Sequence, residues 1–385
     1  MESKAQWQQT SGSAGVNVYG IVVNGSAVVA GMGSGILKST DNGATCSLSN
    51  NGLTSTNVRA MTNIGSYIYA GTFWGGGVFL STDYGTTWTP ESTGLTNKWI
   101  LSLGKNNSDL FAGTSTGGVF LSGDYGSNWV AATSGITAQY TYAITPYSTK
   151  LLAGTEGGVF QSTDNGSTWT ASSTGMPSGA TVSAIAVSGS NIYAGTYQYG
   201  IFLSTDGGTT WAAINTGLTT NNILSFAVNG NAIYAGTNGY GVFISTNSGA
   251  NWTPINTGLT NQTVYSLATD GVTMFAGTAD GIFKRPVGEI NAVNDIAAKS
   301  PIQLSAYPNP FKLETTINYS IPATEKVSLK IYNLIGECIE TPVDETQEPG
   351  SYKVIVDAIK LNSGIYYCTL QTGDTRKTIK LISDK

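Results

Sequence analysis

The chain has 385 residues, enough for two or three domains, and its net charge of −5 comes without the basic stripe that nucleic-acid binders carry. It contains no histidine, which excludes His-based acid–base catalysis and His-ligated metal sites. Charged residues make up 11% and aromatic residues 10%, Gly is abundant, and no apolar run is long enough to span a membrane, so the composition indicates a turn-rich, all-β protein.

The N-terminal residues lack the basic and apolar regions of a signal peptide. Residues 7–10, Trp-Gln-Gln-Thr, instead resemble residues 252–255, Trp-Thr-Pro-Ile, which end a later repeat. They therefore predict a first short strand.

Two short motifs then recur with a period of about 40 residues. The third residues of six Ser-Thr-Asp-x-Gly-x-Thr-Trp boxes are Asp41, Asp83, Asp124, Asp164, Asp206 and Asn247. An Ala-Gly pair inside an apolar strand has seven copies, which begin at Ala30, Ala70, Ala112, Ala153, Ala194, Ala235 and Ala276. A fixed period of this kind indicates one supersecondary unit that is repeated around a ring or along a solenoid.

One repeat, residues 58–90, is typical of four short antiparallel strands. Residues 58–62, 67–72, 77–81 and 87–90 alternate with period two and are separated by Gly-rich or Asp-containing turns. The seventh repeat, residues 264–286, lacks a fourth strand. We expect residues 7–10 to supply it by pairing with residues 281–283, which closes a seven-bladed β-propeller over residues 1–288.

A column of small residues favours a closed ring over a solenoid. The third residue of each first strand is small in all seven repeats: Gly20, Ala60, Ser102, Ala143, Ala184, Ser225 and Ser266. Seven strands that crowd toward one axis require small side chains there, whereas a solenoid does not.

The box itself is interpreted as structural. Its Asp carboxylate is suited to accept backbone N–H groups of its own turn, and its Gly permits the positive φ that follows. A calcium loop of the EF-hand type would need about five oxygen ligands and a closing Glu, which no box has. We therefore predict no metal and no cofactor. Cys46 stands where the other boxes carry Trp, so we expect it to be a small buried residue.

These boxes resemble the Asp-box repeats (bacterial neuraminidase repeats) of sialidases, sortilin-type receptors, certain glucanases and photosystem II assembly factors. The resemblance covers about residues 7–286 and implies that the boxes lie on the face opposite the ligand site. A sialidase would also need three arginines and a Tyr nucleophile. Only Arg59 and Arg285 lie in residues 1–288, which excludes that activity.

A glycoside hydrolase remains the alternative to a non-catalytic protein. That chemistry needs two carboxylates on one face. Glu156 and Asp280 lie in the loops between second and third strands of repeats four and seven, on the face opposite the boxes. The simpler interpretation is that both are solvated loop residues, so we expect no catalytic residues.

Aromatic residues outside the boxes are the candidate ligand-binding residues. Most lie in Gly-rich loops or at the start of first strands: Arg59, Phe73, Trp74, Trp99, Tyr140, Tyr142, Tyr197, Tyr199 and Tyr240. Exposed aromatic rings suit stacking on sugars or burial of a peptide, so polysaccharide is the first expected ligand and a protein partner the second. The alternative is that these rings only plug the channel or cover neighbouring blades.

The composition changes after Gly288. Residues 289–305 form a polar linker, and residues 306–385 predict a small β-sandwich with strands of period two. Its notable elements are the start Tyr307, Pro308, Asn309, Pro310 and Phe311, a turn at Gly336, and the segment that contains Gly364 and Tyr366. Spacing alone leaves open whether Cys338 and Cys368 pair.

This segment resembles the type A C-terminal sorting domain of the type IX secretion system. The resemblance implies Sec export, passage across the outer membrane with the secretion machinery as a partner, and release or surface attachment in a Gram-negative bacterium. The start of the natural gene product is then expected to be missing from this chain. An ordinary accessory β-domain is the alternative. An assembly-factor role fits the propeller but not this tail.

Overall fold

The computed structural model describes residues 6–287, 304–321, 324–348, 350–358, 361–372 and 375–384. The chain separates into two compact units, Met1–Glu289 and Ile290–Lys385. The predicted linker, residues 289–305, falls almost entirely outside the described residues, and so do residues 1–5.

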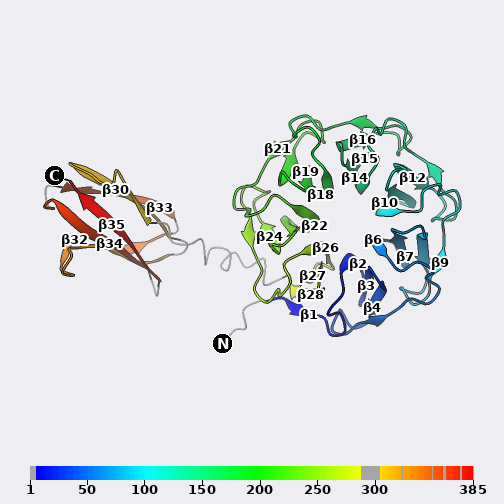
Figure 1. Ribbon diagram of the computed structural model, residues 1–385, viewed down its shortest axis with the longest axis horizontal. Coiled ribbons are helices and arrows are strands. Elements are labelled where there is room, and N and C mark those ends of the chain that lie inside the picture. The colour runs from blue at the N-terminus through cyan, green and yellow to red at the C-terminus, as the bar shows by residue number, and fades with distance from the viewer. Residues whose placement is uncertain are drawn as a thin grey trace. The chain divides into compact units, whose positions relative to one another are not determined.

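Within residues 6–287, seven four-stranded antiparallel sheets form a closed ring, as predicted (Figure 1). The first blade runs outward through β2 (Val18–Asn24), β3 (Ala27–Met32), β4 (Gly35–Ser39) and β5 (Ser47–Leu48). Five blades repeat this order: β6 (Val58–Ile64), β7 (Tyr67–Thr72), β8 (Gly77–Ser81), β9 (Thr89–Pro90); β10 (Ile100–Asn106), β11 (Asp109–Thr114), β12 (Val119–Ser122), β13 (Val130–Ala131); β14 (Thr141–Tyr147), β15 (Lys150–Thr155), β16 (Gly158–Ser162), β17 (Thr170–Ala171); β18 (Val182–Ser188), β19 (Asn191–Thr196), β20 (Ile201–Ser204), β21 (Ala212–Ala213); and β22 (Ile223–Asn229), β23 (Ala232–Thr237), β24 (Val242–Ser245), β25 (Thr253–Pro254).

The seventh blade joins the two ends of the propeller. Its strands are β26 (Val264–Thr269), β27 (Thr273–Thr278) and β28 (Gly281–Pro286), and its outer strand is the N-terminal β1 (Gln8–Gln9). Gln8 lies opposite Lys284 and Gln9 opposite Phe283, so the predicted ring closure is confirmed. Closure removes the sheet edges that an open array would expose.

Buried tryptophans tie six of the seven blades to the preceding blade, and the first blade carries Cys46 instead. The indole of Trp88 donates a 3.0 Å hydrogen bond to the carbonyl of Ser49 in the preceding blade, and Trp211 bonds Ser172 in the same way at 2.7 Å. Trp7 repeats this contact with a 2.6 Å bond to Ile255. Trp7 is 2% exposed, so it occupies the position that a box tryptophan takes elsewhere in the ring.

The Gly of each Ala-Gly pair lets neighbouring blades touch. A Cβ on Gly71 would lie 2.5 Å from the Cγ2 of Ile100 in the next blade, and one on Gly277 would lie 2.7 Å from Val18 across the closure. Any larger residue at these positions would push two blades apart. The recurrence of this Gly in every repeat is therefore a packing requirement of the ring.

Each box forms a closed turn that its Asp holds together. In the fourth, Asp164 accepts hydrogen bonds from the Ser162 hydroxyl at 2.8 Å, the Thr168 amide at 2.8 Å and the Thr168 hydroxyl at 2.6 Å. These bonds, chiefly those from Thr168, lower the pKa of Asp164 to about 2. In the sixth box Asn247 keeps the bonds from Ser245 and the Asn251 amide, with its neutral side chain.

The cysteines are all free. Cys46 was expected to be buried, but it is only half-buried: it packs against the core of the first blade, and its thiol lies 3.3 Å from the backbone carbonyl of Ser11, which follows β1. Cys338 is exposed and Cys368 is buried in the second unit, so the open question of their pairing is answered against a disulfide.

The second unit is a β-sandwich, as predicted. One sheet has the order β29 (Leu304–Tyr307), β30 (Glu314–Ile321) and β33 (Gly350–Asp357). The other has the order β32 (Cys338–Gln347), β31 (Glu325–Tyr332), β34 (Gly364–Thr372) and β35 (Thr375–Ser383). Their facing side chains form one buried core that includes Phe311, Leu329, Tyr366 and Leu370.

The start of this unit is fastened to its last strand. The side chain of Asn309 donates to the Lys380 carbonyl at 2.7 Å and accepts the Ile382 amide at 2.8 Å. Phe311 adds a backbone bond to Ile382 and is 2% exposed, whereas Tyr307 is 80% exposed. The Tyr-Pro-Asn-Pro-Phe segment thus has a structural role, with its tyrosine left at the surface.

The turn at Gly336 is closed by Asn333, which accepts the amides of Ile335 and Glu337. Gly336 has a φ of 85°, which glycine adopts without strain.

Candidate functional site at the channel mouth

The propeller has two different faces. On the box face, the turn between β10 and β11 touches a box of the next blade, because Asn165 donates a 2.6 Å hydrogen bond to Asp109 and accepts one from Asn106. The opposite face carries the loops between second and third strands and the connections between blades. We call this second face the mouth face. All the candidate ligand-binding residues lie in its loops or at the first residues of its inner strands.

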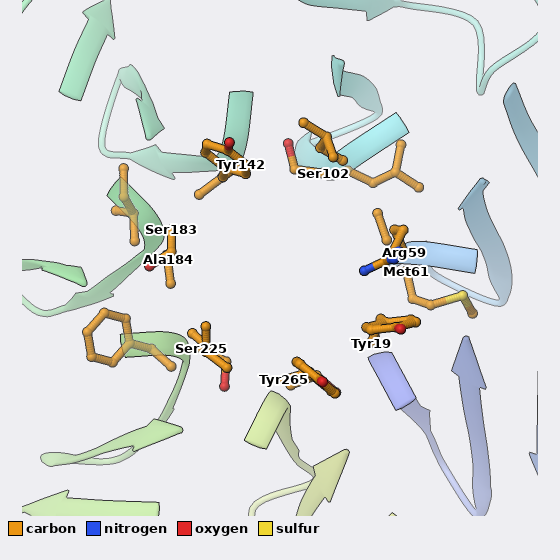
Figure 2. A pocket seen from close by; sticks show the side chains of 18 of the residues that line it. Tyr19, Arg59, Met61, Ser102, Tyr142, Ser183, Ala184, Ser225 and Tyr265 are labelled. Atoms are coloured by element: carbon orange, nitrogen blue, oxygen red, sulfur yellow. The ribbon is translucent and has the colours of Figure 1, made fainter. Parts of the chain in front are cut away.

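A channel cavity of about 480 Å³ opens along the axis of the ring (Figure 2). Its wall includes the second residue of every inner strand: Tyr19, Arg59, Leu101, Tyr142, Ser183, Leu224 and Tyr265. Figure 2 shows the nitrogen end of Arg59 directed into the opening, with Tyr19 and Tyr265 beside it and Tyr142 across from them. Because the seven positions are equivalent in the ring, their differences give the channel its chemistry.

Contacts between rings continue outward on one side of the channel. The ring centroids of Tyr19 and Tyr265 lie 5.0 Å apart. The guanidinium carbon of Arg59 lies 3.9 Å from the centroid of Tyr19 and 5.5 Å from that of Phe73, and Phe73 lies 5.3 Å from Trp99. Such cation–π and tilted contacts fix these side chains relative to one another.

A second group of rings lies in the following blades. Tyr140 and Tyr142 are stacked with centroids 6.1 Å apart, and Tyr142 meets Tyr197 edge-on at 5.7 Å. Together the two groups form what we call the aromatic crescent, which consists of Tyr265, Tyr19, Arg59, Phe73, Trp99, Tyr140, Tyr142 and Tyr197.

A groove of about 420 Å³ lies between the two groups, with Trp99 and Tyr140 among its lining residues. Asn97 accepts the Trp99 amide at 2.9 Å and donates to the hydroxyl of Thr116 at 3.0 Å, so it holds two parts of the lining in place. Thr116 has a φ of 71°, which β-branched residues rarely adopt. The Asn97 bonds therefore position the Trp99 side of the groove.

The remaining candidates stand apart from these contacts. Trp74 is 68% exposed, one residue before Gly75 in the lining of the groove. Tyr199 and Tyr240 are exposed at 38% and 48%, and neither lines the channel cavity or the groove. The structure thus brings six of the nine predicted residues into the crescent and places these three outside it.

Sequence reasoning missed Tyr19 and Tyr265. Both occupy the same column as Arg59 and Tyr142, the second residue of an inner strand, and that column was the signal that could have identified them. The loop aromatics were a weaker signal, since Phe73, Trp74, Tyr199 and Tyr240 line neither cavity.

Tyr142, Tyr197 and Tyr265 keep their protons at neutral pH. Burial raises the pKa of Tyr142 to about 12, and it also raises the pKa values of Tyr197 and Tyr265. Their hydroxyl groups are therefore available as hydrogen-bond donors to a ligand.

The two loop carboxylates are engaged by the backbone. Glu156 accepts the amides of Gln139 and Tyr140 at 2.5 and 2.6 Å, and Asp280 accepts the amide of Gly15 at 2.6 Å. Neither residue lines the channel cavity. These bonds shape the connections beside the mouth, and they leave Glu156 with both oxygens occupied.

No metal-binding cluster of three His, Cys, Asp or Glu side chains occurs in the part of the chain that the structure describes. Among the same residues, no helix is long and apolar enough to cross a membrane.

The family comparison concerns the second unit. Residues 305–384 match the family described as secretion system C-terminal sorting domain. The C-terminal unit is a type IX sorting domain. Its presence marks the chain as a protein that this system exports to the cell surface or beyond, and the predicted engagement of the secretion machinery rests on the sorting domain. No curated protein matches the chain.

Solved structures similar to the chain share its propeller fold. The extracellular domain of a one-component system from B. thetaiotaomicron is 16% identical with a TM-score of 0.62, over 83% of this chain and 46% of that one. PorZ, a surface component of the type IX secretion system of Porphyromonas gingivalis, is 14% identical with a TM-score of 0.54, over 96% and 59%. A GH74 xyloglucanase from Xanthomonas campestris is 14% identical with a TM-score of 0.57, over 98% and 68%.

At these identities the similarity shows the fold alone. The chain spans about half the length of the first two structures. The function of this chain must therefore be argued from its own mouth face.

Proposed function

We propose that this protein is an exported, non-catalytic binding protein whose aromatic crescent recognises polysaccharide outside the cell. The observation that supports the proposal is the pair of ring-contact groups at the channel mouth, which flank a groove lined by Trp99 and Tyr140. The sorting domain supplies the route to that location.

Sugar rings have apolar faces and polar edges, and flat aromatic side chains complement both features. A ring stacks on the apolar face, while a Tyr hydroxyl or an indole N–H reaches the edge. Trp99 and Tyr140 are 47% and 37% exposed, so they retain free surface for such a contact. A ligand pocket usually combines aromatic walls with a few polar groups, and the channel and groove have this composition.

The test is binding of the full chain to a panel of immobilised polysaccharides, with the products assayed for cleavage. We expect binding without hydrolysis, and we expect Trp99→Ala to weaken it by about tenfold or more. Tyr240→Ala is the matched control, because Tyr240 is equally exposed but lies outside both cavities.

Two results would contradict the proposal. The first is failure to bind any polysaccharide, together with binding of a defined protein ligand that Trp99→Ala weakens. This result would show that the crescent binds a protein partner. Hydrolysis that Glu156→Gln abolishes would support the alternative, a glycoside hydrolase that uses Glu156 and Asp280. The backbone bonds of both carboxylates argue against that outcome.

A further inference from the structure

One charged side chain lies among the residues of the channel wall. Arg59 is that residue, and the wall contains no Asp or Glu. Within the described residues, no carboxylate forms an ion pair with Arg59. This contrasts with the acidic character of the whole chain, whose net charge is −5.

The guanidinium group is held in a defined position. Its Nε donates a 2.9 Å hydrogen bond to the side-chain oxygen of Asn57, which is only 5% exposed. Its flat face covers the ring of Tyr19 at 3.9 Å. These contacts use one N–H group and one face. Within the described residues, the Nη atoms have no protein acceptor, and Figure 2 shows this end of the side chain in the channel opening.

The surroundings of Arg59 favour an anion. Tyr19 and Tyr265 lie beside it and Tyr142 lies across the opening (Figure 2), and the hydroxyl groups of Tyr142 and Tyr265 remain protonated at neutral pH. Protonated hydroxyls and guanidinium N–H groups are donors, and carboxylate and sulfate oxygens are acceptors. Bonds between such ionised partners are about twice as strong as neutral ones.

The nearest loop acids lie outside the channel wall. Glu156 stands behind Tyr140, where both of its oxygens accept backbone amides, and Asp280 is bonded to Gly15. Both carboxylates therefore have donors of their own. An arriving anion would find Arg59 as the one unpaired cation of the channel wall.

We infer that the channel recognises an anionic substituent of its ligand, and therefore that the protein binds acidic polysaccharide. Arg59 contributes the charge, the tyrosine hydroxyls contribute further donors, and the crescent stacks on the sugar rings that carry the substituent. The inference rests on the proposed polysaccharide function and specifies its ligand class. The substituent is a carboxylate or a sulfate ester, which present the same acceptor chemistry to a guanidinium group.

The experiment measures dissociation constants of the full chain for two matched pairs of polymers at fixed ionic strength. Polygalacturonate is compared with its fully methyl-esterified form, and dextran sulfate with dextran. We expect at least one charged polymer to bind about tenfold or more tightly than its neutral partner, and we expect added salt to weaken that binding. The pair that shows the difference identifies the substituent as carboxylate or sulfate.

Three variants locate the effect. Arg59→Gln is expected to remove the preference for the charged polymer, Arg59→Lys to retain part of it, and Tyr142→Phe to reduce it several-fold with the ring left in place. Lys38→Gln makes the same change in net charge on the box face, where Lys38 contacts Thr86, and should leave affinity unchanged. Unfolding curves of all variants establish that each one is folded.

Two outcomes would overturn the inference, and they are distinguishable. Equal binding of charged and neutral polymers, lost with Trp99→Ala but unchanged in Arg59→Gln, would leave the polysaccharide function intact and refute the anionic subsite. Binding to none of the four polymers or to the wider panel would refute the proposed function itself.

Discussion

The two faces of the propeller are built from the same seven repeats, yet the residues of the box face are nearly the same in each repeat, whereas those of the mouth face vary. On the box face, Asp41, Asp83, Asp124, Asp164 and Asp206 each bind their own turn with the same bonds. On the mouth face, the equivalent second residues of the inner strands differ from blade to blade, among them Tyr19, Arg59 and Ser183. Residues that repeat in every blade stabilise the ring. Residues that differ between blades at an equivalent position are the candidates for ligand binding.

Breaking the repeated contacts should cost the most stability. Trp7→Ala removes a buried indole and the hydrogen bond to Ile255 that closes the ring, so we expect the free energy of unfolding to fall by about 3–5 kcal/mol. Urea unfolding followed by tryptophan fluorescence measures the loss. Trp74→Ala serves as the control, because Trp74 is 68% exposed and its removal should change stability by less than about 0.5 kcal/mol. An equal loss in both variants would contradict the account of closure.

Substitutions of the variable channel residues should lower ligand affinity much more than they lower the stability of the propeller. Tyr265→Ala removes a ring that contacts Tyr19 at the channel wall. We expect about a tenfold loss of polysaccharide affinity with a small change in stability, since Tyr265 is only half-buried. Calorimetric titration against the best-bound polymer gives the affinity. A loss of stability as large as that in Trp7→Ala would show that Tyr265 has a structural role in the ring.

The box carboxylates should give the propeller a dependence on acid. The pKa of Asp164 is lowered to about 2 in the folded protein, so its bonds stabilise the fold above the unfolded pKa, near 4, and that contribution is lost as the pH falls toward 2. Asp164→Asn copies the natural residue at Asn247 and should weaken the dependence of the unfolding midpoint on pH between 4 and 2. Thermal melts across this range test the prediction, and an unchanged slope would contradict it.

The smallest expected effect concerns the loop acids. Glu156→Gln keeps an oxygen that can accept one backbone amide but replaces the other with a donor, so we expect a loss of less than about 1 kcal/mol at this half-buried site. We expect no turnover in either the parent chain or the variant, because we propose that the protein is non-catalytic. Urea unfolding and an assay of released reducing sugar test both statements. If the parent chain hydrolyses a polysaccharide and this variant does not, the protein is a glycoside hydrolase and not a non-catalytic binding protein.

The fold could be predicted from the sequence because nearly the same pattern recurs in every blade. The period of the boxes, the seven Ala-Gly pairs and the match of Trp7 to a box tryptophan together specified the ring and its closure. Cys46 was misjudged because its surroundings include the backbone of Ser11, a contact that no local pattern records.

The site was predicted only in part for the same reason. Trp99, Tyr140 and Tyr142 were identified as exposed or axial aromatics, but contacts such as that of Arg59 with Tyr19 join different blades. Tyr265 and Tyr19 are far apart in the chain, and they become neighbours only when the seventh blade meets the first. Side-chain contacts across a closure depend on three-dimensional distances that spacing along the chain does not give.

A pair of matched double variants tests the central claim, that the mouth face and not the box face binds the ligand. Trp99→Ala/Tyr140→Ala alters the groove, and Tyr84→Ala/Tyr125→Ala removes tyrosines of 47% and 45% exposure from the box turns. Their dissociation constants for the best-bound polysaccharide are compared with that of the parent chain. We expect a loss of about a hundredfold in the first variant and none in the second. Equal losses, or a loss confined to the box-face variant, would contradict it.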